Sequence, residues 1–268
     1  MNDDIYEIFA LKYAHSDRRS SENFIGGDEH DVPMPLAYYT WVIRNGRRTF
    51  VVDTGFDERS AAKRKRDLLR PVGEGLKTIG VDPDAVSDVI ITHMHYDHAG
   101  NDDLFPRARF HLQDCEMNYA TGRCMCHHQL NHPYDVDNVV AMVRRVYAGR
   151  VAFHDGITEL APGITLHRVG GHARGLQVVR VKTARGHVVL TSDAAHFYAH
   201  LDRRKVFPTV DSVADVHEGY DTVLRLATSR DHVIPGHDPA VLDLYPSADP
   251  RLSGWVARLD PEPSKSNC

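Results

Sequence analysis

Four side chains that can bind metal ions lie within six consecutive positions: His93, His95, Asp97 and His98. The apolar run 89–91 directly before them predicts a buried strand. His93 and His95 are two positions apart, so on an extended strand end they point to the same side and can bind one ion. Asp97 and His98 follow where the strand stops and can face a second ion nearby. The cluster therefore predicts a dinuclear metal centre.

The types of ligand select the metal. Imidazole and carboxylate groups without thiolates favour divalent zinc, with manganese or iron as alternatives, and they disfavour a purely structural zinc site. Two ions need more ligands than one cluster supplies. Three further candidates each end an apolar run beside small residues: His172, Asp193 and His237. Glycine near them lets the backbone approach an ion closely, so these loops suit metal ligands.

The ordered set resembles the HxHxDH…H…D…H series of the metallo-β-lactamase superfamily, with every position filled: His93, His95, Asp97, His98, His172, Asp193 and His237. The resemblance spans about residues 35–240. It implies an α+β fold, the αββα sandwich of that superfamily. It also implies how the ligands divide. The first metal would be held by His93, His95 and His172. The second would be held by Asp97, His98 and His237, and Asp193 would bridge both. The alternative is a set of surface histidines, since the chain has 18 histidines; their order at strand ends disfavours it.

Length and composition are typical of one globular enzyme domain. The chain has 268 residues, and its 42% of hydrophobic residues is enough for a sizeable core. We expect a single hydrolase domain over residues 1–268. Segments 16–35 and 115–135 are predicted to be lids, and the polar tail 261–268 is predicted to fray.

Charge and hydropathy exclude several partners. The net charge of −5 with mixed signs provides no basic surface for nucleic acid. The amino terminus does not resemble a signal peptide, and no apolar run of about 18 residues could span a membrane. We therefore expect a cytoplasmic protein with a small-molecule substrate and no nucleic-acid or membrane partner. The sequence leaves the oligomeric state open.

The four cysteines, Cys115, Cys124, Cys126 and Cys268, show no disulfide framework and suit a reducing compartment. The stretch Cys124-Met125-Cys126-His127-His128 raises the hypothesis of a structural zinc site, with Cys115 or His132 as a further ligand. This stretch lacks a second pair of cysteine or histidine ligands elsewhere in the chain. A loop over the active site is therefore the favoured interpretation.

Alternation, periodicity and turn residues predict the elements that position the ligands. Strands are predicted at residues 5–13, 37–44, 48–53, 107–112, 164–169, 176–182, 187–191 and 231–234. Helices are predicted at 58–69, 72–80, 114–120, 136–147 and 212–228. Asn45-Gly46 is a strong signal for a tight turn between two strands.

Three local patterns carry more specific predictions. The run Lys63-Arg64-Lys65-Arg66 is interpreted as a solvated helix face rather than a nucleic-acid site. The apolar stripe Val139, Val140, Val143 and Val146 is predicted to be core. Asp53 ends a strand in a glycine turn, and two roles stay open for it: it either accepts an imidazole N–H from a metal ligand or caps the turn.

A pair of divalent ions implies hydrolysis. Bound metals lower the pKa of water from about 15.7 to roughly 7, so a hydroxide held between two ions would attack a docked carbonyl. Asp97 would then pass a proton to the leaving oxygen. The spacings from His172 to Asp193 and from Asp193 to His237 resemble most the N-acyl homoserine lactone lactonase group. The resemblance thus implies opening of a small lactone.

Other members of the superfamily are alternatives. A glyoxalase II-like thioesterase shares all seven ligands, but it usually carries a basic carboxy-terminal region, and few positive residues follow His237 here. Class B β-lactamases generally lack a carboxylate at the position of Asp193. Diiron flavoproteins replace one histidine of the cluster by a carboxylate. Another ester or amide hydrolase of the same fold stays open.

One position departs from the lactonase pattern. That group has a tyrosine three residues after the bridging carboxylate, where this chain has His196. We expect His196 to donate a hydrogen bond to the substrate or to act as an acid, since imidazole titrates at about 6.5. The alternative is a surface-loop histidine. Tyr198, two positions further on, is the second candidate for this role.

The substrate pocket is expected to be walled by the two lids and by segment 194–209. Its aromatic and polar wall residues would be Tyr119, Met125, His128, Tyr134, Phe197, Tyr198 and Phe207. Arg174 and either Arg203 or Arg204 would meet a carboxylate on the substrate, unless they are solvated surface charges.

Overall fold

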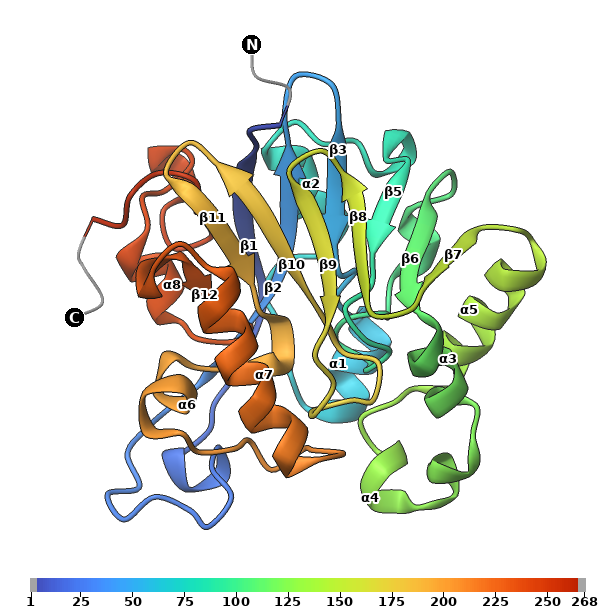
Figure 1. Ribbon diagram of the computed structural model, residues 1–268, viewed down its shortest axis with the longest axis vertical. Helices are drawn as coiled ribbons and strands as arrows, with labels where there is room; N and C mark the ends of the chain where they lie inside the picture. Colours follow the sequence, from blue (N-terminus) through green and yellow to red (C-terminus); the bar gives the residue numbers. More distant parts are fainter. Residues whose placement is uncertain (1–3, 265–268) are drawn as a thin grey trace.

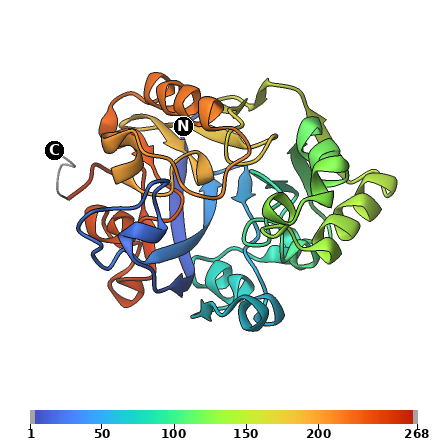
Figure 2. The same ribbon diagram turned by 90° about the horizontal axis from the view of Figure 1, so that it is seen from below.

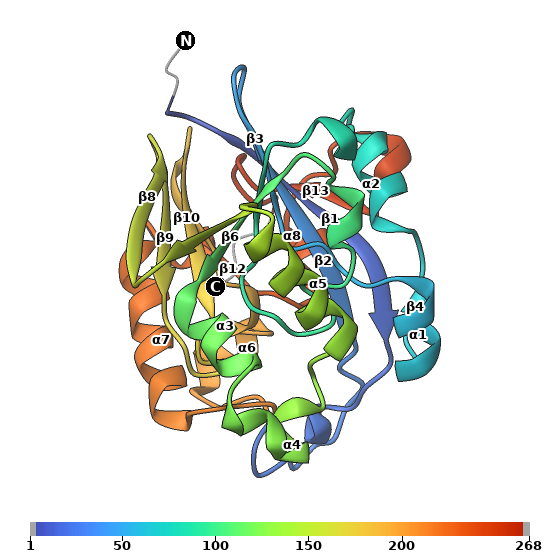
Figure 3. The same cartoon turned by 90° about the vertical axis from the view of Figure 1, so that its right-hand side faces the viewer.

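Two β-sheets lie face to face at the centre of the molecule, and helices cover both outer faces (Figures 1 and 3). This computed structural model describes residues 4–264. Seen from below (Figure 2), the orange helix near residues 213–226 and the cyan helices near residues 58–78 lie on opposite sides of the two sheets. The predicted α+β fold, an αββα sandwich, is therefore confirmed.

The first sheet has eight strands within residues 4–264: β1 (Glu7–Ser16), β2 (Leu36–Arg44), β3 (Thr49–Val52), β4 (Asp67–Leu68), β5 (Asp88–Ile90), β6 (Arg109–Gln113), β7 (Val151–His154) and β13 (Val256–Arg258). Their order is β13-β1-β2-β3-β5-β6-β7, and β4 pairs with β1. Neighbouring strands in the part β13-β1-β2-β3 are antiparallel, whereas β3, β5, β6 and β7 run parallel.

The second sheet has five strands in the described part of the chain: β8 (Ile157–Ala161), β9 (Ile164–Arg168), β10 (Gln177–Thr183), β11 (Gly186–Leu190) and β12 (Val233–Ile234). Their order is β12-β11-β10-β9-β8. Neighbours are antiparallel except β11 and β12, which are parallel. Strands β9, β11 and β12 thus share one direction, so their carboxyl ends meet at one edge of the sheet.

The helices are α1 (Glu58–Arg64), α2 (Val72–Thr78), α3 (Asp114–Ala120), α4 (His128–Asn131), α5 (Val136–Tyr147), α6 (Tyr198–Arg203), α7 (Val213–Leu226) and α8 (Ala240–Leu244). Leu76 of α2 and Met142 of α5 belong to the apolar cluster outside the first sheet. Leu201 of α6 and Val223 of α7 belong to the cluster outside the second. No helix within residues 4–264 is long and apolar enough to cross a membrane.

Strand β2 shows why the sheets stack. Its side chains alternate between faces. Trp41 and Ile43 enter the apolar cluster between the sheets, where Val179 of β10 also packs. Tyr38 and Val42 enter the cluster under the helices. Because both faces of the strand are apolar and buried, the first sheet needs a layer on each side.

Several predicted elements are confirmed. Helices α3 and α5 have the predicted bounds, and the predicted hairpin forms as β2 and β3. Asn45 shapes its turn, because its Oδ1 accepts hydrogen bonds from the backbone N–H groups of Arg47 and Arg48 at 2.9 Å.

Other predictions were wrong. The helix predicted over 58–69 ends at Arg64, because Lys65 adopts a left-handed conformation (φ 54°) and the chain turns into β4. The predicted core stripe of α5 is only partly buried: Val140 is 40% exposed, and Met142 is fully buried instead. The strand predicted at 231–234 shrinks to β12, and a strand that was not predicted, β13, pairs with β1.

Strands β7 and β8 were not predicted. Each lies at an edge of its sheet, and Ile157 of β8 is 72% exposed, so their sequences carry little alternation between buried and exposed positions. Of the tail predicted to fray, residues 265–268 lie outside the described residues. Ser264 donates its backbone N–H to the carbonyl of Leu244.

Candidate metal centre

The predicted ligands follow the carboxyl ends of four strands. The cluster 93–98 follows β5, His172 follows β9, Asp193 follows β11 and His237 follows β12. These strand ends lie at the lower edge of the sandwich in Figure 1. Residues far apart in the sequence therefore converge on one point, and all seven predicted ligands are buried there.

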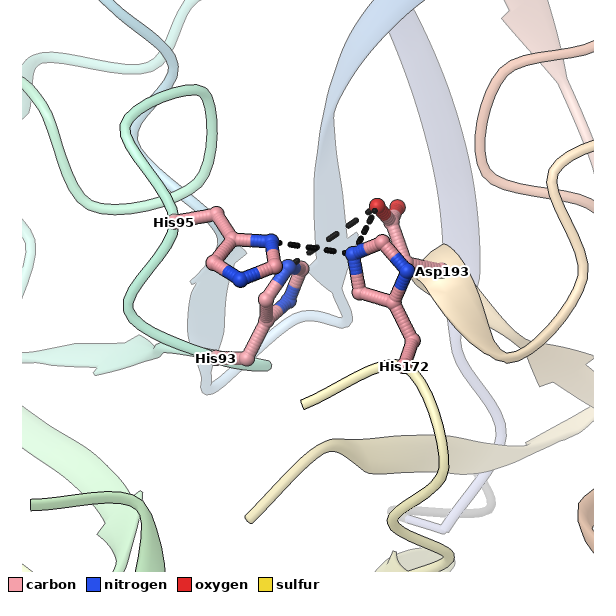
Figure 4. A group of neighbouring side chains, drawn as sticks. All are labelled: His93, His95, His172 and Asp193. Carbon is pink, nitrogen blue, oxygen red and sulfur yellow. Dashed lines mark hydrogen bonds and ion pairs between the residues drawn. The ribbon is translucent and has the colours of Figure 1, made fainter. Parts of the chain in front are cut away.

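The first ligand group comprises His93, His95 and His172, with Asp193 beside them (Figure 4). The Nδ1 atom of His95 lies 2.9 Å from Nε2 of His172. Oδ2 of Asp193 lies 3.0 Å from Nε2 of His172 and 3.8 Å from Nε2 of His93. One ligand atom from each of the four residues lies within 4.8 Å of all the others.

The second ligand group comprises Asp97, His98 and His237. It faces the other oxygen of the same carboxylate. Oδ1 of Asp193 lies 3.2 Å from Nε2 of His98 and 2.9 Å from Nε2 of His237. Oδ2 of Asp97 lies 3.6 Å from Nε2 of His98. The two oxygens of Asp193 thus point to different groups, which is the geometry of a bridging ligand.

The residues present fit metal ions. Ligand atoms around a tetrahedral zinc at 2.0–2.1 Å are separated by roughly 3.3 Å, and the distances above scatter around that value. The Nε2 atoms of His93 and His98 are buried without a hydrogen-bond partner in the described chain. Buried polar atoms without partners are costly unless a ligand satisfies them. Two divalent ions would satisfy both nitrogens.

Hydrogen bonds on the opposite ring nitrogens orient these histidines. His98 donates from Nδ1 to Oδ2 of Asp53 at 2.7 Å, and His237 donates from Nδ1 to the carbonyl of Ala37 at 2.9 Å. In the neutral form of each ring, the lone pair is then left on Nε2, which faces Asp193. The hydrogen bond proposed for Asp53 is present. Asp53 also accepts from the backbone N–H of Thr92 at 2.7 Å, and its left-handed φ of 60° directs the carboxylate inward.

A second buried carboxylate, Glu116 of α3, was not predicted from the sequence. It is 0% exposed. Its Oε1 accepts from the backbone N–H of Met94 and from the hydroxyl of Tyr134, both at 2.9 Å, and its Oε2 accepts from the N–H of Gly175 at 2.8 Å. Met94 separates two ligands, and Gly175 follows His172. Glu116 therefore ties together the loops of the first ligand group. No local sequence signal marks it.

Burial and neighbouring charges shift the pKa values of the centre in different directions. Burial opposes protonation of His98, but nearby carboxylates, Asp193 foremost, raise its pKa well above the usual value. Burial lowers the pKa of His93 and His95 well below the usual value, so both imidazoles are neutral and can act as ligands. Burial opposes ionisation of Asp193, but the surrounding histidines, His196 foremost, hold its pKa well below the usual range. The carboxylate is thus charged and ready to bind cations.

His196 lies at this centre, as predicted. Its Nε2 is 3.2 Å from Oδ2 of Asp193, and its ring stacks on Phe207 with centroids 3.7 Å apart. The alternative of a surface-loop histidine was wrong, because the side chain is 4% exposed. Tyr198 instead packs in the core between the sheets, so it does not compete with His196 for a role at the centre.

A cavity of about 120 Å³ lies against both ligand groups. Of the predicted wall residues only Phe207 lines it. Its lining also includes Arg18 from the first predicted lid, His132 from the second, and Arg64 and Arg66. The interpretation of the 63–66 run as a solvated helix face was therefore wrong for these two arginines, because the early end of α1 turns them inward.

The arginines predicted to meet the substrate are engaged elsewhere. Arg203 pairs with Asp28 at 3.0 Å and Arg204 with Asp221 at 2.7 Å. Arg174 pairs with Asp211 at 3.2 Å. The hypothesis of a structural zinc at Cys124–His128 finds no support either. Within residues 4–264, no group of three metal-capable side chains includes its cysteines.

Comparison with known proteins places the chain in a family. The family model of the Metallo-beta-lactamase superfamily matches residues 33–244, most of the chain. This chain belongs to the metallo-β-lactamase superfamily. The seven-residue resemblance noted above is thereby confirmed at the level of the family.

Relatives within the superfamily include N-acyl homoserine lactonase AiiB of Agrobacterium fabrum. It is 30% identical over 176 residues, which are 62% of this chain and 61% of the relative. The matched region thus spans about three fifths of that relative.

Solved structures agree on the fold. A quorum-quenching N-acyl homoserine lactone lactonase superposes with a TM-score of 0.72 at 20% identity, covering 89% of this chain and 94% of that chain. AidC, a dizinc quorum-quenching lactonase, has a TM-score of 0.67 at 15% identity, covering 88% and 89%. At these identities the likeness is one of fold.

Proposed function

We propose that this chain is a metal-dependent hydrolase that opens a small lactone ring at a dinuclear centre. The observation that carries the proposal is Asp193, whose two oxygens face two separate ligand groups. The ligands of the first ion would be His93, His95 and His172. Those of the second would be Asp97, His98 and His237, with Asp193 as the bridge. Zinc suits this donor set best, with manganese or iron as alternatives.

When bound, two divalent ions would supply activation of water near neutral pH and polarisation of the substrate carbonyl. The side chains of the protein supply the rest. Asp97 lines the cavity and is held at its backbone, where the carbonyl accepts a hydrogen bond from Tyr13 at 2.9 Å. In our proposal, Asp97 holds the proton that passes to the leaving oxygen. His196, which also lines the cavity, donates a hydrogen bond to the substrate.

The choice of a lactone over other acyl substrates is supported by the relative named above, an N-acyl homoserine lactonase. The cavity also favours a small ring. Its volume of about 120 Å³ is below the range of roughly 300–1,000 Å³ that is typical of pockets for larger ligands.

The test is hydrolysis by zinc-loaded protein of a panel that contains simple lactones, N-acyl homoserine lactones, a thioester and a penicillin. We expect lactones to be opened far faster than the penicillin, with activity lost on chelation and regained on adding zinc. Asp193→Ala should lose activity, whereas the surface control Asp221→Asn should keep it. Equal or faster turnover of the thioester or the penicillin would overturn the assignment.

A further inference from the structure

Three arginines line the same cavity as the metal ligands: Arg18, Arg64 and Arg66. They come from separate points of the chain. Arg18 follows β1, whereas Arg64 ends α1 and Arg66 precedes β4. The cavity lining holds two carboxylates, Asp97 and Asp193, and both belong to the metal ligand groups.

None of these arginines forms an ion pair with a carboxylate in the described chain, although many other arginines of the protein do. Arg204 and Arg258, for example, pair with acidic side chains at 2.7 and 3.0 Å. Arg18 is close enough to Arg66 for the two charges to repel each other, because Arg66 is among the groups that lower the pKa of Arg18, after burial. Acidic side chains act on these arginines only at longer range, Glu22 on Arg18 and Asp97 on Arg66. Half-buried positive charges that face a cavity without an ion-pair partner favour an anion there.

Arg18 is held in place by neutral groups. One of its terminal nitrogens donates to the carbonyl of Glu22 at 2.6 Å, and the guanidinium carbon lies 5.1 Å from the ring centroid of Phe207. Phe207 in turn stacks on His196 beside the metal centre. Nε of Arg18 is buried without a partner, and Nη1 makes no hydrogen bond to the described residues. The side chain therefore has donors left for a ligand.

Arg66 is anchored in a similar way. Its Nε donates to the hydroxyl of Tyr96 at 3.2 Å and its Nη1 to the hydroxyl of Ser16 at 3.3 Å. Nη2 makes no hydrogen bond within residues 4–264. Arg64 differs, because both its terminal nitrogens donate to backbone carbonyls, those of His132 and Tyr134. The donor left on Arg64 is its buried Nε, whereas Arg18 and Arg66 each keep a terminal nitrogen free.

From this arrangement we propose that the substrate is a compact lactone that carries a carboxylate, which binds Arg18 and Arg66 while its ring carbonyl lies at the metal centre. This inference rests on the proposed function and names its substrate class. A guanidinium suits the role because it can donate two parallel hydrogen bonds to a carboxylate.

The test compares a γ-butyrolactone bearing a carboxylate with the matched primary amide, which has nearly the same shape and no charge. We expect wild-type protein to show kcat/KM at least about tenfold higher for the acid. Arg66→Gln and Arg18→Gln should each lower kcat/KM for the acid by roughly tenfold to a hundredfold, since each removes a charge-assisted hydrogen bond. The kcat/KM for the amide should change little.

Controls separate binding from folding. Arg66→Lys keeps the charge and should recover part of the preference for the acid. Arg204→Gln, which removes a surface arginine paired with Asp221, should leave the preference unchanged. If the role of Arg66 were merely structural, Arg66→Gln would lower kcat/KM for both substrates alike. A second readout is the affinity of metal-free protein for the ring-opened dicarboxylate, which should weaken in Arg66→Gln.

The outcomes are distinguishable. Equal kcat/KM for the acid and the amide in the wild type overturns the carboxylate proposal and leaves lactone opening intact. If no lactone is opened at all, the proposed function fails. In that case, the affinity for the ring-opened dicarboxylate decides about the anion site. If Arg18→Gln and Arg66→Gln bind it as tightly as the wild type does, the anion site is overturned as well.

Discussion

Replacing Glu116 by Gln is the sharpest test of how the centre is held together. The carboxylate of Glu116 accepts three hydrogen bonds, from Met94, Tyr134 and Gly175. An amide keeps one acceptor oxygen, but its NH₂ group then faces a donor, so at least one buried N–H is left unpaired. Such a group costs about 1–3 kcal/mol, and we expect the free energy of unfolding to fall by that amount.

The same change should loosen the loops that carry the first ligand group. Loss of a hydrogen bond that orients metal ligands typically lowers metal affinity by about 10–100-fold. Urea unfolding of the metal-free protein measures the first effect, and competition with a chromophoric chelator measures the second. The matched control is Glu218→Gln on the exposed face of α7, where a surface change is expected to stay within about 0.5 kcal/mol.

If Glu116→Gln matches Glu218→Gln in both unfolding free energy and zinc affinity, Glu116 does not support the centre. Glu116→Ala is the stronger version of the test. It leaves all three donors unpaired, so the loss should reach about 3 kcal/mol or more.

Three further predictions concern single residues. Asp193→Ala should reduce bound zinc from about two ions per chain, measured by elemental analysis, and two tightly held ions in the variant would exclude a bridging role. His196→Ala should lower kcat about 10²-fold, or about 2.7 kcal/mol, with zinc content unchanged; an unaltered kcat would leave His196 as a packing partner of Phe207. Burial lowers the pKa of His200 to about 4. The unfolded chain therefore binds a proton that the folded protein excludes, and His200 should cost up to about 3 kcal/mol of stability as pH falls from about 6.5 to 4. Urea unfolding of wild type and His200→Gln at several pH values should diverge in this window, and parallel curves would contradict the assignment.

The sequence by itself predicted the candidate ligand set and determined the class of fold. The metal-capable residues are grouped at the ends of apolar runs, and the pattern of a strand followed by a glycine-containing loop is local in the chain. Helices α3 and α5 could also be predicted from the sequence, because the pattern that marks each helix lies within its own segment. Asp193 and His237 could be named for the same reason, although 44 positions separate them.

Tertiary structure alone decided what surrounds the ligands. Glu116 bonds to residues 22 and 59 positions away, and no periodicity marks such contacts. The charged run 63–66 is typical of a solvated helix. Only the left-handed turn at Lys65 and the pairing of β4 with β1 bring Arg64 and Arg66 to the cavity. The local pattern indicates which groups can bind a metal, whereas long-range packing decides which charged side chains line the cavity.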